Sequence, residues 1–229
     1  MDISKQFSLT DFLAYFFPGA FATVGVYFLA QLTSAKTFFT VSSLDITTGI
    51  SFLIASYIIG VIFSGLSFGA VKWIEKFTRY KSPQTSLPLD LFPNEIHRAF
   101  RDVFGIEKES KFIWTKNHYR LCRSLVISKM PILAPRIARQ DDMALFRRNL
   151  VFPMFIWSAV GIGWGILNFS QGVRNQGTAV IVFSFLFSFF IIKITIERMH
   201  NSINAETRET MLGFLAGYKT GVFDKPKMS

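Results

Sequence analysis

Three pairs of arginines are the side chains whose type and spacing best suit recognition of an anion. Each pair is separated by three positions on a segment with a helical pattern, and the pairs are Arg98/Arg101, Arg120/Arg123 and Arg136/Arg139. Residues at i and i+3 share a helix face, and two guanidinium forks on one face can bind a phosphate or a carboxylate. We predict these six arginines as contacts to an anion or an acidic partner. The competing interpretation is contact with anionic lipid headgroups.

No other group of residues has a spacing that predicts catalysis or metal binding. His118 and Cys122 are four apart, but two ligands do not make a zinc site, and we expect this single cysteine to be a small packed residue. We expect Asp141 and Asp142 to lie on a solvated helix face. The chain contains no HExxH, GxSxG or Gly-rich phosphate motif. We therefore expect no catalytic residue, no cofactor and no metal.

The elements that must position the arginines include four strongly apolar stretches without a single Asp, Glu, Lys or Arg. A membrane-spanning helix needs about 20 mostly apolar residues. We predict an all-α membrane protein whose four transmembrane helices form two hairpins, with a helical cytosolic domain between spans two and three. The spans are expected at about 12–32, 46–71, 149–170 and 176–192. The predicted parts are hairpin one over 1–80, the cytosolic domain over 81–148, hairpin two over 149–192, and a cytosolic extension and tail over 193–229.

The distribution of basic residues predicts the orientation. The segment 72–148 contains sixteen Lys and Arg residues against eight acids, while Lys36 and Arg174 are the basic residues of the loops after spans one and three. Positive residues stay on the cytoplasmic side, so we predict an inner-membrane protein with both termini in the cytoplasm. The net charge of +10 is then mainly a topology signal, and a nucleic-acid partner is not directly indicated. The uncharged spans argue against a coupled transporter but leave an uncoupled pore open.

Span two carries a stripe of small residues that predicts close helix packing. The residues are Ser56, Gly60, Ser64, Gly65 and Gly69. Small residues four apart let helix backbones approach closely in a membrane. The stripe can face helix one of the same chain or another subunit, and the sequence does not choose between them. Because it offers more positions than one partner needs, we predict a homo-oligomer.

The remaining helices follow from prolines, glycines and apolar periodicity. Pro18-Gly19 interrupts span one, where we predict a hinge, with a purely structural kink as the alternative. In the middle segment, one helix is expected to open at Pro93 and stop at Gly105, and a second to run from about Glu109 to Lys129. A third is expected to begin near Arg136 and continue into span three. Span four is expected to continue as a helix past Lys193 and pack on the middle domain.

Three segments give the chain a resemblance to a group of bacterial proteins. They are "DFLAYFFPGAF", "ASYIIGVIFSGLS" and "ARQDDMALFRRNLVFPMFIW". On these segments the chain resembles small four-span membrane proteins with a helical cytosolic middle, some encoded in anti-phage defence loci, such as the membrane subunit of the Kiwa system. The resemblance covers the architecture of most of the chain and implies a role in defence. It assigns no role to any individual residue.

Three function classes are compatible with these features. The first is a non-enzymatic sensor or anchor that oligomerises, binds anionic lipid headgroups, and recruits or signals to a soluble cytosolic protein. The second is a permeability effector or pore gated by a cytosolic ligand. The third is a lipid-modifying enzyme, for which the sequence offers no catalytic set. We expect the first, and the sequence does not identify the partner or the number of subunits.

Overall fold

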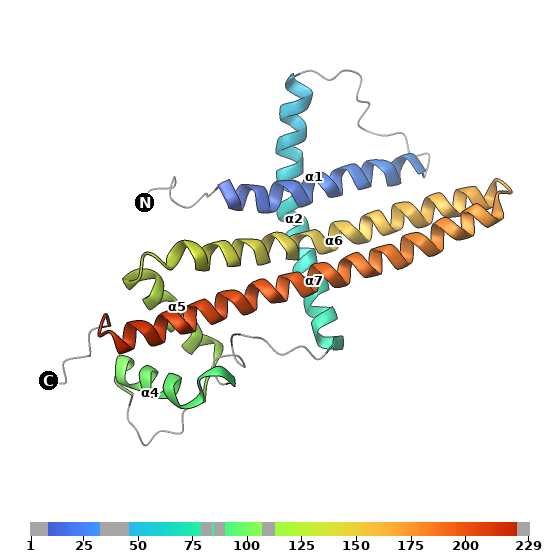
Figure 1. Ribbon diagram of the computed structural model, residues 1–229. Helices are drawn as coiled ribbons and strands as arrows, with labels where there is room; N and C mark the ends of the chain where they lie inside the picture. The colour runs from blue at the N-terminus through green and yellow to red at the C-terminus, as the bar shows by residue number, and fades with distance from the viewer. Residues whose placement is uncertain (1–8, 33–45, 79–83, 85–89, 107–112, 224–229) are drawn as a thin grey trace. The chain divides into compact units, whose positions relative to one another are not determined.

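The structure is a computed structural model that describes residues 9–32, 46–78, 84, 90–106 and 113–223 (Figure 1). Within these ranges the chain is helical and has no β-strand. The six helices there are α1 (Leu9–Leu32), α2 (Ile46–Thr78), α4 (Pro93–Phe104), α5 (Lys116–Lys129), α6 (Ala134–Ser170) and α7 (Arg174–Lys219). Four of these, α1, α2, α6 and α7, are long and apolar enough to cross a membrane. The predictions of an all-helical chain and of four candidate spans are confirmed.

The chain divides into two compact units. One, the span unit, comprises Met1–Thr78 and Leu145–Met199; the other, the helical unit, comprises Arg79–Ala144 and His200–Ser229. Both α6 and α7 are continuous helices that contribute residues to each unit. The expected continuation of the helix past Lys193 is therefore found.

In the span unit, two glycines bring α1 and α2 into backbone contact. A Cβ added to Gly19 would lie 1.8 Å from the carbonyl oxygen of Ser56, and one added to Gly60 would lie 2.0 Å from that of Tyr15. Real Cβ atoms do not approach oxygen so closely, so this crossing needs a glycine on each helix. The Ser56 and Gly60 part of the small-residue stripe thus faces helix one of the same chain.

The helical unit has its own apolar core, to which four helices contribute. Ile96 and Phe100 of α4 pack with Val126 of α5, Ile137 of α6 and Phe214 of α7, all fully buried. The α7 residues in this core belong to the stretch past Lys193 that was expected to pack on the middle segment.

The ends of α4 and α7 are set by left-handed glycines. α4 begins at Pro93 and stops at Gly105, as expected, where φ is +67° and the N–H of Ile106 bonds the carbonyl of Arg101 at 3.1 Å. After α7, Gly221 has φ +70° and the N–H of Val222 returns to the carbonyl of Gly217 at 2.9 Å. Both ends satisfy carbonyls that the last helical turn leaves open.

The expected start of the next helix near Glu109 is wrong. Residues 113–115 are described and are not helical, and α5 begins at Lys116; residues 107–112 lie outside the described part. Thr115 occupies the N-cap with extended backbone, and its N–H donates to Nδ1 of His118 at 3.1 Å. Trp114 is buried and its indole N–H donates to the carbonyl of Gln84 at 3.1 Å. Capping and this anchored indole, rather than apolar periodicity, decide where the helix starts.

The glycine crossing makes a testable prediction. Gly60→Ala should lower the free energy of unfolding by about 1–3 kcal/mol, because α1 and α2 must separate to admit the methyl group. Gly65→Ala is the matched control on the same helix, since an added Cβ at Gly65 has no neighbour within 4 Å. Reversible unfolding of the full chain in detergent or bicelles measures both. Equal stability of the two variants would contradict the crossing.

Candidate functional site

Two prolines inside helices of the span unit each leave a carbonyl without its helical donor. Pro18 lies in α1 and Pro153 in α6. Proline has no N–H, so the carbonyl four residues earlier loses its bond; these are the carbonyls of Ala14 and Asn149. Ala14 and Asn149 are both buried. An unsatisfied carbonyl in an apolar environment costs several kcal/mol, so each needs a donor from elsewhere.

Asn149 and Ser67 supply the missing donors. The side-chain amide of Asn149 donates to the carbonyl of Ala14 at 3.1 Å. The hydroxyl of Ser67, on α2, donates to the carbonyl of Asn149 at 3.2 Å and accepts from the N–H of Phe152 at 3.1 Å. The break in α1 is thus repaired by α6, and the break in α6 is repaired by α2.

Ser64 completes this cluster, which we call the asparagine node (Ala14, Ser64, Ser67 and Asn149). Its hydroxyl donates to Oδ1 of Asn149 at 2.9 Å, and Nη2 of Arg148 lies 3.4 Å from the same hydroxyl. Asn149 is fully buried with both ends of its amide bonded. The node therefore connects α1, α2 and α6 through directional bonds.

Only some of the predicted packing and hinge residues contact another helix of the chain. Ser56 and Gly60 face α1, and Ser64 belongs to the asparagine node, whereas Cβ atoms added to Gly65 and Gly69 would have no neighbour within 4 Å. At the predicted hinge, Pro18 is fully buried and Gly19 forms the glycine crossing. A hinge at Pro18-Gly19 stays a prediction.

In the helical unit, the six predicted arginines also separate into different uses. Arg98, Arg120, Arg136 and Arg139 are exposed, and Arg101 is partly buried. Arg123 is partly buried and bonds two carboxylates of its own unit. The contact with an anionic partner stays a prediction for the exposed residues, while Arg123 has an internal role that its spacing did not indicate.

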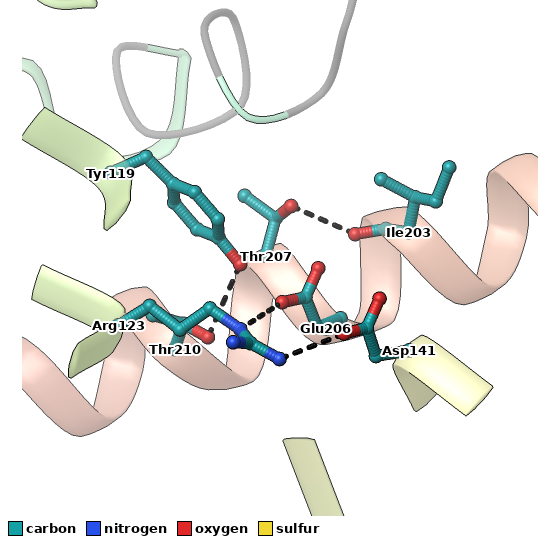
Figure 2. Close-up of polar contacts among 7 residues, drawn as sticks. All are labelled: Tyr119, Arg123, Asp141, Ile203, Glu206, Thr207 and Thr210. Carbon is teal, nitrogen blue, oxygen red and sulfur yellow. Dashed lines mark hydrogen bonds and ion pairs between the residues drawn. The ribbon is translucent and has the colours of Figure 1, made fainter. Parts of the chain in front are cut away.

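Arg123 joins three helices of the helical unit (Figure 2). Its Nε donates to Oε1 of Glu206 on α7 at 2.8 Å, and its Nη2 donates to Oδ2 of Asp141 on α6 at 2.9 Å. The Glu206 side chain is 5% exposed, whereas that of Asp141 is 62% exposed. Beside them the hydroxyl of Tyr119 donates to Oγ1 of Thr210 at 3.4 Å. Asp141, expected on a solvated face, is exposed but also holds this ion pair.

Burial and ion pairing together set the pKa values of this cluster. It raises the pKa of the Glu206 carboxyl above its ordinary value, while hydrogen bonding with Tyr119 and the charge of Arg123 act in the opposite direction. Burial alone lowers the pKa of Arg123, but the charges of Glu206 and Asp141 outweigh it and the pKa rises. Burial also raises the pKa of Tyr119, so its hydroxyl stays protonated and acts as a donor.

The remaining candidate for chemistry, Cys122, is fully buried in the core of the helical unit. Burial raises the pKa of its thiol, which suppresses the reactive thiolate. His118, four residues earlier, is used in the α5 cap. Within the described ranges, no group of three or more His, Cys, Asp and Glu residues could hold a metal ion.

Sequence reasoning missed the polar residues that connect helices. Asn149, Ser67 and Glu206 are buried polar side chains, but none is part of a recognisable motif. The prolines do give a signal, since position i−4 from each names the carbonyl that needs a donor. The identity of the donor is decided by another helix and could not be read from the same segment.

Comparison with protein-family models, curated proteins and solved structures finds no match for this chain.

The asparagine node predicts coupling between two distant positions. Asn149→Leu should destabilise the chain by about 1–2 kcal/mol, because the carbonyl of Ala14 loses its donor. Pro18→Ala restores a backbone N–H to that carbonyl, so Asn149→Leu should cost less in the Pro18→Ala background. Unfolding free energies of the full chain in bicelles, for the two single variants and the double variant, give the coupling energy.

Ser67→Ala is the control for this cycle. It removes the donor that serves the carbonyl affected by Pro153, so its cost should be the same with or without Pro18→Ala. Strict additivity of Pro18→Ala and Asn149→Leu would show that Asn149 does not repair the α1 break.

The Arg123 cluster predicts a pH-dependent loss of stability. Arg123→Met should destabilise the helical unit by about 2 kcal/mol, less than for a fully buried pair because Arg123 is partly exposed. Without the cation the pKa of Glu206 rises further. A carboxyl with a raised folded pKa contributes stability that is present below its unfolded pKa and lost as pH rises through the folded pKa. The loss should therefore grow as the pH rises above about 4.3, the ordinary pKa of a glutamate carboxyl.

Protection factors of α5 amides in nanodiscs measure this loss at each pH. Glu206→Gln added to Arg123→Met should flatten the pH dependence, because the buried charge is gone. Arg120→Met, at an exposed position on the same helix, is the control and should change little. A pH-independent effect of Arg123→Met would contradict the role of Glu206.

Proposed function

We propose that this protein is a non-enzymatic anchor or sensor subunit of the bacterial inner membrane that recruits a soluble, acidic cytosolic protein to its helical unit. The observation that carries the proposal is the continuity of α6 and α7, each of which contributes both a candidate span and part of the helical unit. A partner on the helical unit then binds helices that are also candidate spans. Such helices can transmit a contact when their packing has two arrangements.

The internal order of the helical unit supports a role as a docking module. Its core is closed by four helices, and the Arg123 cluster ties α5 to the first turns of α6 and to α7. A rigid unit loses little conformational entropy when a partner binds, which favours affinity. In this proposal the Arg123 cluster keeps the helices of the docking surface in place and does not itself contact the partner.

The exposed arginines support an acidic partner. Arg98 on α4, Arg120 on α5, and Arg136 and Arg139 on α6 present guanidinium groups to solvent. Guanidinium forks bind carboxylates through paired hydrogen bonds. Charge complementarity of this kind directs partner choice and speeds association. Headgroup contact by the same arginines is the alternative that the experiment below separates.

The two other function classes have less support. Ser64 and Ser67 bond within the asparagine node, and the hydroxyl of Thr23 donates to the carbonyl of Gly19 at 2.8 Å, so these groups are engaged in helix contacts rather than offered to a pore. For a lipid-modifying enzyme, the geometry of the described part of the chain suggests no catalytic group.

Assembly and biological setting complete the proposal. Gly65 and Gly69 on α2 leave open space that a second copy can occupy, which supports the expected homo-oligomer. A role in anti-phage defence, implied by the resemblance of three segments to proteins of such loci, is the setting in which recruitment of a soluble partner has an evident use.

Replacement of exposed arginines tests the proposal. Arg120→Gln combined with Arg136→Gln and Arg139→Gln should reduce recovery of the soluble partner at least about tenfold, equivalent to roughly 1.4 kcal/mol. The measurement is quantitative co-purification with the tagged full chain in mild detergent from the native host. Added salt should weaken the interaction of the parent protein in the same direction.

The control is Arg208→Gln, which removes an exposed charge from α7 in the same unit. Arg123 is left intact because it holds the helices together. All variants should reach the membrane fraction at equal levels. If the triple variant recovers the same partner as the parent, the arginines contact lipid and the docking proposal fails.

A further inference from the structure

An open groove with a volume of about 420 Å³ lies between α6 and α7 in the span unit, and Phe21 of α1 is also part of its lining. Its floor is the contact of Gly161 with Ser184, where a Cβ added to Gly161 would lie 2.1 Å from the serine hydroxyl. Aromatic rings form its walls, with Trp164 on α6 and Phe183 and Phe187 on α7 more than half exposed. This volume is within the range of sites that hold small organic ligands.

The groove has the length of one leaflet of a bilayer. Its lining extends over residues 154–164 of α6 and 180–191 of α7. At about 1.5 Å per helical residue this is about 15 Å, half of the roughly 30 Å hydrocarbon core of a membrane. Both segments are in helices that are apolar enough to span a membrane, and in a bilayer the groove would open to hydrocarbon.

The walls favour a flexible chain over another helix. Helix contacts in membranes use small residues, and here small residues of α6 already contact α7. Gly165 is one of them, since an added Cβ would lie 2.9 Å from the carbonyl oxygen of Gly177. The opening of the groove is bordered by bulky aromatic side chains of both helices. A hydrocarbon chain can follow such side chains, whereas a second helix cannot approach closely.

Positive charge gathers beyond one end of the groove. Ile191 ends the lining on α7, and Arg198 lies seven residues further along on the same face of the helix, whereas Lys193 lies on the other side. Nη1 of Arg147 donates to the carbonyl of Arg198 at 2.5 Å, which places the Arg147 guanidinium beside this turn of α7. Glu197 lies 3.8 Å from Lys193, but both side chains are about 60% exposed and such a pair is weak. The net charge here is positive.

We propose that the α6–α7 groove binds one acyl chain of an anionic phospholipid, with its phosphate held by Arg147 and Arg198. The groove has the length of one leaflet, aromatic walls that suit an acyl chain, and basic residues beyond one end that suit a phosphate. These features together match this one class of ligand. The site uses residues of the span unit and is independent of the partner proposed for the helical unit.

Quenching of tryptophan fluorescence by brominated lipids tests the site. Trp73→Phe and Trp114→Phe leave Trp157 and Trp164, both in the groove lining, as the reporters. The full chain is placed in phosphatidylcholine vesicles containing phosphatidylglycerol or phosphatidylcholine brominated on the acyl chain. Brominated phosphatidylglycerol should quench at a lower mole fraction than brominated phosphatidylcholine, by about fivefold for each basic residue that contributes.

Two pairs of variants separate the groove from its charge. Ser188→Phe fills the groove and should remove the preferential quenching, whereas Ala179→Phe adds the same ring on α7 outside the lining and should not. Arg147→Gln with Arg198→Gln should abolish the preference for phosphatidylglycerol but retain quenching by both lipids. Arg174→Gln, beyond the opposite end, should leave the preference unchanged.

Three results would overturn the proposal. Equal quenching by the two brominated lipids would mean that the groove holds ordinary annular lipid. Loss of preference in Arg174→Gln alone would put the phosphate at the other end. Quenching that disappears at high protein-to-lipid ratio would mean that a second copy of the chain fills the groove.

Discussion

The span unit depends on how it satisfies two carbonyls that prolines leave without donors. In water such a carbonyl would bond solvent, but in hydrocarbon the donor must come from protein. The amide of Asn149 serves the carbonyl affected by Pro18, and the hydroxyl of Ser67 serves the one affected by Pro153. Each donor comes from a different helix from the one it repairs, so the three helices cannot slide past one another without leaving a carbonyl unpaired.

The helical unit uses a comparable device in a different environment. Arg123 connects three helices through two carboxylates, one buried and one largely exposed. Apolar packing of its core supplies most of the favourable free energy, but apolar contacts tolerate small shifts between helices. The hydrogen bonds of Arg123, at 2.8 Å and 2.9 Å, do not tolerate such shifts. In both units, therefore, one polar side chain that bonds to two neighbouring helices fixes their register.

The same two helices contribute residues to both units. α6 carries Asp141 in the helical unit and Asn149 in the span unit, and α7 carries Glu206 as well as the aromatic wall of the groove. A change in the packing of either helix therefore affects groups in each unit. This continuity, more than any single side chain, is what makes a recruiting or sensing role physically reasonable.

The sequence by itself determined the helical class, the four candidate spans, the start of α4 at Pro93 and its end at Gly105, because these follow from local composition and from what proline and glycine permit. It did not determine the start of α5, where Thr115 and Trp114 form contacts that override apolar periodicity. Nor could it separate Arg123 from Arg120, which have the same type and share a helix face. Only the tertiary structure decided which arginine meets carboxylates, which serine repairs a proline break, and which glycines touch another helix, since each of those outcomes depends on a residue distant in the chain.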